Sequence, residues 1–284
     1  MESERDTRTG RRCWKAGLLL LLVVGLCAAP ALASDGVLEI NQAKVIKAGG
    51  FPYVISQNGS YRLTSNLDVT IAADPKNTAA IEVVALDATI DLNGFSILGP
   101  AVCSGIPVTS CSNTGTGAGV FSLNGIVVRN GTIRGMGGAG IVAIRGSVER
   151  VHVIGNGSDG IYGAAIVMNC NVEMNGQSGI YTNGLVIGNS VMWNKADGIF
   201  VLLEATVSGN NSSSNGRNGI TVSTTGVVSN NTATGNASYG LSLIVNTIGY
   251  VGNVLYNNNG GIANPQVVGG FNLGQNLCNA ALCP

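Results

Sequence analysis

The sequence predicts an all-β solenoid, in which one chain winds into about nine to eleven stacked coils of a parallel β-helix with a cap at each end. Three observations support this fold class. A glycine followed by an aliphatic residue recurs at a nearly constant interval of roughly 20 positions along the chain. Forty-two of the 284 residues are glycine, too many for a helical protein. Short valine and isoleucine runs broken by asparagine and glycine replace any sustained helical period.

Residues 1–33 have the features of a secretory signal peptide. Basic residues precede an uninterrupted apolar stretch at 17–29, and Ala31-Leu32-Ala33 then supplies a small-x-small cleavage pattern. The apolar stretch is too short to span a bilayer comfortably, although an uncleaved anchor is the alternative. We therefore predict an exported protein, periplasmic, cell-surface or extracellular, with no membrane span after cleavage.

The charge balance argues against several classes of function. Charged residues make up 11% of the chain, with 15 acidic and 15 basic residues. Without a basic surplus, nucleic-acid binding is not expected. His152 is the only histidine, and no group of residues has metal-ligand spacing, so neither a metal nor another cofactor is expected.

Five cysteines remain after the predicted cleavage. Cys103 and Cys111 bracket one loop, and Cys278 and Cys283 bracket the tail. An oxidising compartment favours two local disulfides, although the sequence alone leaves the pairing open. Cys170 stands in "IVMNCNVEM" and is expected to be a small buried residue of a strand.

The repeat predicts the inside of the solenoid. A period near 20 with several short strands corresponds to one turn of a parallel β-helix, with coils about 4.8 Å apart and the aliphatic residues stacked in the interior. The glycine of each pair is expected to permit the backbone conformation of a sharp corner. The pairs are Gly119-Val120, Gly140-Ile141, Gly160-Ile161, Gly179-Ile180, Gly198-Ile199, Gly219-Ile220, Gly240-Leu241 and Gly261-Ile262.

Two columns of asparagine accompany the repeat. Stacked asparagine amides can pass hydrogen bonds from coil to coil and so satisfy polar groups that the stack removes from water. The column five residues before the aliphatic residue is Asn156, Asn175, Asn194, Asn215, Asn236 and Asn257. The column ten residues before it is Asn189, Asn210 and Asn231, with Cys170 in the equivalent place one coil earlier.

The organisation of the mature chain, residues 34–284, follows from this register. Residues 34–80 are predicted to form an N-terminal cap and the first strands, and residues 81–265 the coils. Residues 101–118 interrupt the coils as a loop that bulges out between them. Residues 266–284 are predicted to seal the other end, because an exposed solenoid end is an aggregation hazard.

At "IDLNGFSILGP" (90–100), and through the repeated "NG-x-x-GI", the chain resembles right-handed parallel β-helix repeat proteins of the pectin-lyase-like superfamily, in particular a secreted bacterial group. The resemblance covers residues 60–265 and implies a single-stranded right-handed helix. The superfamily includes pectate lyases, polygalacturonases, alginate epimerases, phage tailspikes and adhesins, so it implies no single activity. The Asp-Asp, Gly-His-Gly, Arg-x-Lys and Asp-Pro-His-Glu signatures of its catalytic members are missing.

Asp159 and Asp197 form one candidate catalytic pair. They stand two coils apart, which separates their backbones by about 9.6 Å, twice the strand spacing. Inverting glycosidases hold two carboxyl groups roughly 6.5–9.5 Å apart. The alternative is that both are ordinary turn residues that bond their own backbone.

Tyr162, Tyr181 and Phe200 each follow an inward aliphatic residue and are therefore expected to stack on the outside of adjacent coils. Such a ladder, extended by Trp193, could be a platform for sugar rings. Ordinary cross-strand pairing is the alternative explanation.

His152, Glu173, Arg134 and Arg150 are expected to lie on one wall by register. This group could bind an acidic sugar or transfer protons. The alternative is a solvated polar face.

Arg129 and Glu149 share a register position. They are expected to form a surface ion pair.

The predicted function is an exported, non-catalytic β-helix that binds glycan or a surface protein along one flank. The alternative is a polysaccharide-active lyase, hydrolase or epimerase with an atypical site, so the sequence leaves open whether the protein is an enzyme.

Overall fold

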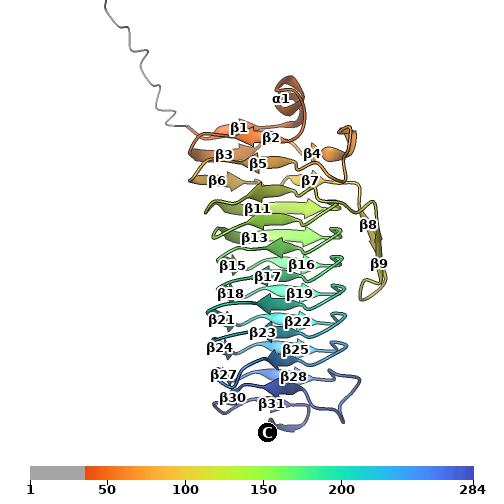
Figure 1. The fold of residues 1–284 in the computed structure, drawn as a ribbon, viewed down its shortest axis with the longest axis vertical. Helices are drawn as coiled ribbons and strands as arrows, with labels where there is room; N and C mark the ends of the chain where they lie inside the picture. Colours follow the sequence, from red (N-terminus) through yellow and green to blue (C-terminus); the bar gives the residue numbers. More distant parts are fainter. Residues whose placement is uncertain (1–35) are drawn as a thin grey trace, which may run out of the picture. The chain divides into compact units, whose positions relative to one another are not determined.

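The computed structural model describes residues 36–284, so the predicted signal peptide lies outside the described residues. The described chain winds into a right-handed parallel β-helix of about 11 turns, which confirms the predicted fold class (Figure 1). Within residues 36–284, no helix is both long and apolar enough to cross a membrane.

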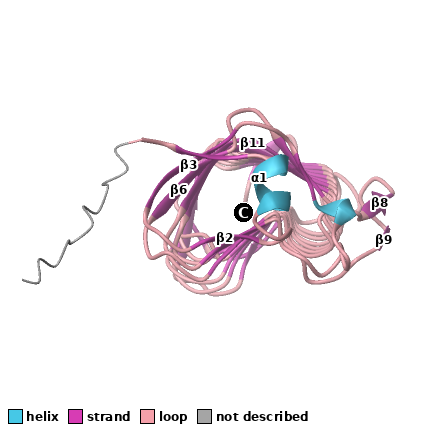
Figure 2. Ribbon diagram, turned by 90° about the horizontal axis from the view of Figure 1, so that it is seen from above, coloured by secondary structure: helices cyan, strands magenta, loops and turns pink. Residues whose placement is uncertain are grey.

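Each regular coil contributes three short strands separated by turns, and every coil pairs in parallel with the next (Figure 2). We call the three resulting stacks the first, second and third walls. One coil illustrates them with β15 (Ile166–Met168), β16 (Asn171–Glu173) and β17 (Ile180–Thr182) in that order.

The first and second walls belong to one 20-stranded sheet, in which β11 (Val127–Arg134) and β13 (Ser147–Ile154) span both walls. The other strands of the first wall are β1 (Leu38–Ile40), β3 (Gly59–Leu63), β6 (Ala88–Asp91), β15, β18 (Leu185–Ile187), β21 (Ala205–Ser208), β24 (Gly226–Ser229), β27 (Ile248–Val251) and β30 (Phe271–Asn272). Those of the second wall are β4 (Leu67–Asp68), β7 (Ser96–Leu98), β16, β19 (Ser190–Met192), β22 (Asn211–Ser213), β25 (Thr232–Thr234), β28 (Val254–Tyr256) and β31 (Leu277–Cys278).

The third wall is a separate 10-stranded sheet. Its strands are β2 (Tyr53–Ile55), β5 (Ile81–Val83), β10 (Val120–Ser122), β12 (Ile141–Ala143), β14 (Ile161–Tyr162), β17, β20 (Ile199–Val201), β23 (Ile220–Val222), β26 (Leu241–Leu243) and β29 (Val267–Gly269).

The predicted aliphatic column fills the interior behind the third wall from Val120 to Leu241, and every one of these residues is fully buried. The last predicted member, Ile262, does not belong to the column. Leu241 pairs with Val267, whereas Ile262 is 62% exposed. The cause is an extra loop in the last coil, which moves the next inward position further along the chain.

Glycine is required in each pair for a different reason from the one predicted. Among these glycines, only Gly261 has a positive φ. A Cβ on Gly160 would lie 2.4 Å from Val172 Cγ1 and 2.6 Å from the Gly179 carbonyl, so close packing excludes a side chain there. The left-handed residues stand immediately before the ladder asparagines instead, and Met174 (φ 55°) is one example.

The first asparagine ladder runs through the interior of the turns after the second wall. Asn194 Oδ1 accepts hydrogen bonds from the backbone N–H (3.0 Å) and from Nδ2 (2.9 Å) of Asn175, and the pattern repeats in each coil. Asn257 is not part of it. The ladder continues from Asn236 to Asn258, which is fully buried, and ends at Gln266.

The second ladder lies at the turn between the first and second walls. The backbone N–H of Cys170 donates to Asn189 Oδ1 at 2.9 Å, so Cys170 does begin this column. The ladder extends beyond Asn231 to Asn253 and Asn276, which the sequence pattern did not identify. Burial raises the pKa of the Cys170 thiol to about 11, in keeping with a packing role.

A short helix, α1 (Gln42–Lys47), lies over the first strands at the N-terminal end (Figure 1). Asn41 caps it by accepting the N–H of Lys44, and Val45 is buried beneath it. A cap was predicted here but no helix, because so short a segment cannot show a helical period.

The interruption at 101–118 contains an antiparallel hairpin of β8 (Val102–Ser104) and β9 (Ser110–Ser112), which we call the hairpin. A Cys103–Cys111 disulfide joins its strands. As predicted, the hairpin projects from the stack between early coils, and it then runs along the turns that follow the second wall (Figure 1). At its tip, the N–H of Val108 donates to the Trp193 carbonyl at 3.0 Å.

The tail crosses the end of the last coil. β32 (Ala281–Leu282) pairs antiparallel with β31, and a disulfide joins Cys278 to Cys283. The Tyr250 hydroxyl, at the buried end of a first-wall strand, donates to the Pro284 carbonyl at 3.2 Å.

Candidate functional site

A groove of about 730 Å³ lies on the outer face of the second wall, beside the root of the hairpin. Alternate residues of β7, β11 and β13 point outward, and parallel register stacks them into two columns. One column consists of Ser96, Thr132 and His152, and the other of Leu98, Arg134 and Ile154. Val102 and Cys103 of the hairpin form one side of the groove. The groove is therefore built where the hairpin leaves the coils.

Arg134 supplies an unpaired guanidinium in this groove. Its side chain is exposed and makes no hydrogen bond or ion pair with any of residues 36–284. The one acidic residue lining the groove, Asp68, is already engaged, because its Oδ1 accepts from the N–H (3.0 Å) and the hydroxyl (2.6 Å) of Thr70. The guanidinium therefore keeps its N–H donors for a ligand.

His152 and Glu173 meet at the edge of the groove. His152 Nε2 lies 2.7 Å from Glu173 Oε1, and the side chains are 38% and 14% exposed respectively. The more buried carboxylate holds the imidazole in place, as an orienting carboxylate does for a general base. Asn171, which pairs in register with His152, has the one side-chain atom of the described chain, Oδ1, that is buried without a partner. The sequence indicated His152 and Glu173 but gave no reason to select Asn171.

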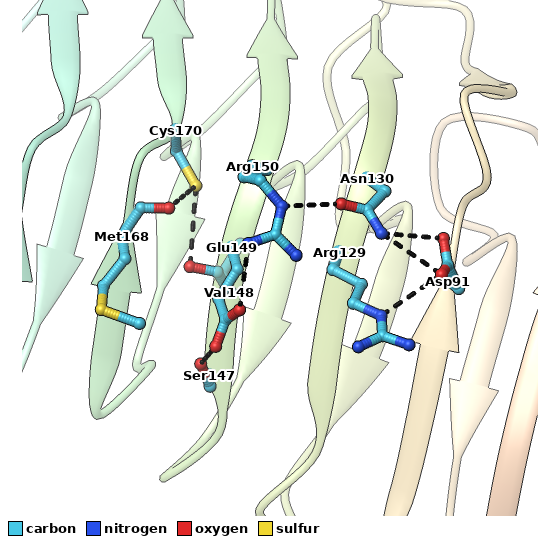
Figure 3. Close-up of polar contacts among 9 residues, drawn as sticks. All are labelled: Asp91, Arg129, Asn130, Ser147, Val148, Glu149, Arg150, Met168 and Cys170. Atoms are coloured by element: carbon cyan, nitrogen blue, oxygen red, sulfur yellow. Dashed lines mark hydrogen bonds and ion pairs between the residues drawn. The ribbon is translucent and has the colours of Figure 1, made fainter.

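Arg150 does not join this site. It has a left-handed backbone conformation (φ 51°) within β13, and its Nε donates to Asn130 Oδ1 at 2.9 Å (Figure 3). Its Nη1 lies 3.7 Å from Glu149 Oε2. The left-handed residue interrupts the alternation of inward and outward side chains along the strand, so the sequence position of Arg150 does not predict where its side chain lies.

The predicted ion pair between Arg129 and Glu149 is wrong. The two residues share a register position, but Arg129 Nε reaches back one coil to Asp91 Oδ2 at 3.3 Å, and Glu149 pairs with Arg150 (Figure 3). Asp91 also accepts hydrogen bonds from Asn130 Nδ2, so Arg129 and Asn130 share one carboxylate.

Asp159 and Asp197 both bond the backbone of the following coil. Asp159 Oδ1 accepts the N–H of Ser178, and Asp197 Oδ1 accepts the N–H of Asn218, each at 2.9 Å. Asp197 Oδ2 also accepts the Thr221 hydroxyl, and Asp197 is only 3% exposed. Burial raises the pKa of Asp159 to about 6. These contacts give both carboxylates a structural role between coils. Asp159 also bonds its own backbone N–H, as the turn alternative predicted.

Tyr162, Tyr181 and Phe200 form the predicted ladder on the outside of the third wall. Their ring centroids are 5.2 Å and 4.9 Å apart, with interplanar angles of 18° and 3°. Stacking turns both faces of Tyr181 toward the neighbouring rings, which leaves its edge rather than an open face for a sugar. Trp193 lies elsewhere, in the turn under the tip of the hairpin, where its carbonyl accepts from Val108.

The comparisons with known proteins bear on the architecture. No family model and no curated protein matches the chain. Among solved structures, the A-module of the mannuronan C-5 epimerase AlgE4 from Azotobacter vinelandii is similar, with 15% identity and a TM-score of 0.38, covering 80% of this chain and 74% of that chain. Because that likeness is weak, it is the strand pairing within this chain that defines it as a right-handed parallel β-helix.

Proposed function

We propose that the protein binds a segment of an acidic polysaccharide in the groove between the second wall and the hairpin. The observation that carries this proposal is the free guanidinium of Arg134 in a groove otherwise lined mainly by hydroxyl and apolar groups. A planar guanidinium matches a carboxylate or sulfate in two parallel hydrogen bonds. Thr132 and Ser96 add hydroxyl groups of the kind that exchange hydrogen bonds with sugars.

The groove suits a glycan better than the aromatic ladder does. A sugar ring packs against an open aromatic face, and the faces of Tyr181 are turned toward Tyr162 on one side and Phe200 on the other. Two disulfides favour a protein that works in an oxidising compartment outside the cytoplasm, where polysaccharides are met.

The test begins with binding of the purified protein to an array of acidic and neutral glycans. For any acidic glycan bound, Arg134→Gln is compared with Arg145→Gln, since Arg145 is an arginine in a turn outside the groove. A hydrogen-bonded charge contributes about 1.5–3 kcal/mol, so we expect Arg134→Gln to weaken binding roughly 10- to 100-fold and Arg145→Gln to leave it unchanged. Equal affinities of the two variants, or binding to no acidic glycan, would refute the proposal.

A second candidate function is catalysis on the bound glycan. The observation that favours it is the 2.7 Å contact of Glu173 with His152, whose ring lies at the groove. A histidine oriented by a carboxylate can act as general base or general acid. The check is mass spectrometry of the glycan after incubation. Products made by the wild type but not by His152→Gln, with binding retained, would identify an enzyme, and an unchanged glycan would identify a binding protein.

A further inference from the structure

The C-terminal end of the β-helix carries an apolar collar. We define the collar as the large apolar side chains of residues 267–284 that are more than two-fifths exposed. They are Val268 (41%), Phe271 (63%), Leu273 (53%), Leu277 (43%) and Leu282 (71%). A monomeric surface seldom gathers so many exposed apolar side chains in so short a segment, and such clusters mark interaction sites.

The same end presents unpaired strand edges. In the described chain, β29 pairs only with β26, and β30 pairs only with β27. The tail strand β32 pairs with β31, and Asn272 of β30 donates from Nδ2 to the carbonyls of Cys283 (3.0 Å) and Pro284 (3.1 Å), but no described strand pairs with the outer edge of β29 or β30. Open edges with N–H and C=O groups are templates for an added strand, and a partner that offers strands of its own can pair with them.

The charge distribution indicates which partner fits. After Arg217, the chain contains no Asp, Glu, Lys, Arg or His up to residue 284. An acidic or basic partner therefore finds no side-chain charge to pair with at this end. A second copy of the same chain brings a surface equally free of charged side chains, so no side-chain charges repel each other where the two ends meet.

The N-terminal end also exposes apolar side chains, such as Ile46 (56%) and Ile71 (59%), but it differs from the C-terminal end in carrying charge. It is closed by α1, which carries Lys44 and Lys47 in its last turn. A head-to-tail stack would place this charged helix against the apolar collar, and it would continue into an open filament. A two-fold pairing of C-terminal ends closes at two chains.

We propose that the protein forms a tail-to-tail homodimer through its last coil. The edges of β29 and β30 pair antiparallel with the edges of the second copy across a two-fold axis. The collar side chains of the two copies then pack against each other on the outside of the joined walls.

The experiment measures the mass of the purified protein in solution by light scattering and sedimentation over a wide concentration range. We expect the mass of two chains, and a maximum dimension in small-angle scattering close to twice that of one β-helix. Phe271→Asp and Val268→Asp should each give folded monomers, since either places a charge, and in the dimer its symmetry mate, in an apolar contact. Leu86→Asp, at a position 75% exposed near the other end, should remain dimeric.

Three results would overturn the proposal. They are a wild-type protein that is monomeric at all concentrations, a dimer that both collar variants leave intact, and larger assemblies that show head-to-tail growth. Circular dichroism spectra of the variants separate loss of the dimer from loss of the fold.

Discussion

Removing one rung of the first asparagine ladder should cost a large part of the stability of the β-helix. Asn194 is fully buried, and its amide makes four hydrogen bonds. In Asn194→Ala, the backbone N–H of Asn175 loses its acceptor and the carbonyl of Val172 loses a donor (3.2 Å). A buried group without a partner costs roughly 1–3 kcal/mol, so the two together give about 2–6 kcal/mol.

The neighbouring rungs limit the loss to these two groups. Asn175 Nδ2 keeps the Val153 carbonyl, and Asn215 Oδ1 keeps the backbone N–H of residue 194. The matched control is Asn183→Ala, because Asn183 is exposed and its side chain makes no hydrogen bond in the described chain. This control should change the free energy of unfolding by less than about 0.5 kcal/mol.

Equilibrium unfolding in urea measures both variants, and hydrogen exchange of the Asn175 amide reports the local effect. Stacked coils can unfold in stages, so the exchange measurement identifies where the loss occurs. A loss below about 1 kcal/mol in Asn194→Ala, with the Asn175 amide still protected, would refute the view that the ladder satisfies buried backbone groups.

Three further perturbations follow from the structure. Gly179→Ala should destabilise the protein by at least about 1–3 kcal/mol, because its Cβ would lie 2.4 Å from Val191 Cγ1, whereas Gly125→Ala, with 3.5 Å to its nearest neighbour, should be nearly neutral in thermal melts. The raised pKa of Asp159 means that the stabilising contribution of its protonated form is complete below about pH 4 and is lost as the pH rises through about 6. Relative to Asp159→Asn, the wild type should lose up to about 3 kcal/mol of unfolding free energy between pH 4 and 7 in urea titrations. Parallel pH curves of the two proteins would contradict this. Replacing Cys103 and Cys111 together by serine should speed hydrogen exchange in the hairpin and weaken glycan binding. The coils should still melt within a few degrees of the wild type. Unchanged binding would show that the hairpin is not needed as a side of the groove.

The repeated part of the fold was predictable because stacking demands the same residue at the same place in every coil. Asn175, Asn194 and Asn215 could be located from spacing alone, since each rung needs an amide to bond the next. The prediction failed in the last coil, where the sequence separation between ladder partners increases from 21 to 22 and a loop is added after Asn258. Neither change alters the local composition, so nothing in the sequence distinguishes Asn257 from Asn258.

The candidate site was predictable only where strand register decides it. Arg134, His152 and Glu173 do lie on one outer face, because alternate residues of parallel strands stack. Arg150 was misplaced because a left-handed backbone at an arginine is uncommon and breaks the alternation. The groove itself depends on how the hairpin packs against distant turns, and no local pattern in 101–118 specifies that contact.

The two ladders have a consequence for how the length of this protein can change. Every coil bonds only its two neighbours, and each rung of a ladder is the same chemical group, so the molecule contains no mark that counts coils. Loss or duplication of one whole repeat beyond Trp193, the residue that the hairpin tip contacts, would rejoin equivalent positions and leave both the hairpin groove and the final coil intact. Evolution can thus lengthen or shorten the distance between the hairpin groove and the final coil in steps of about 4.8 Å, one coil at a time.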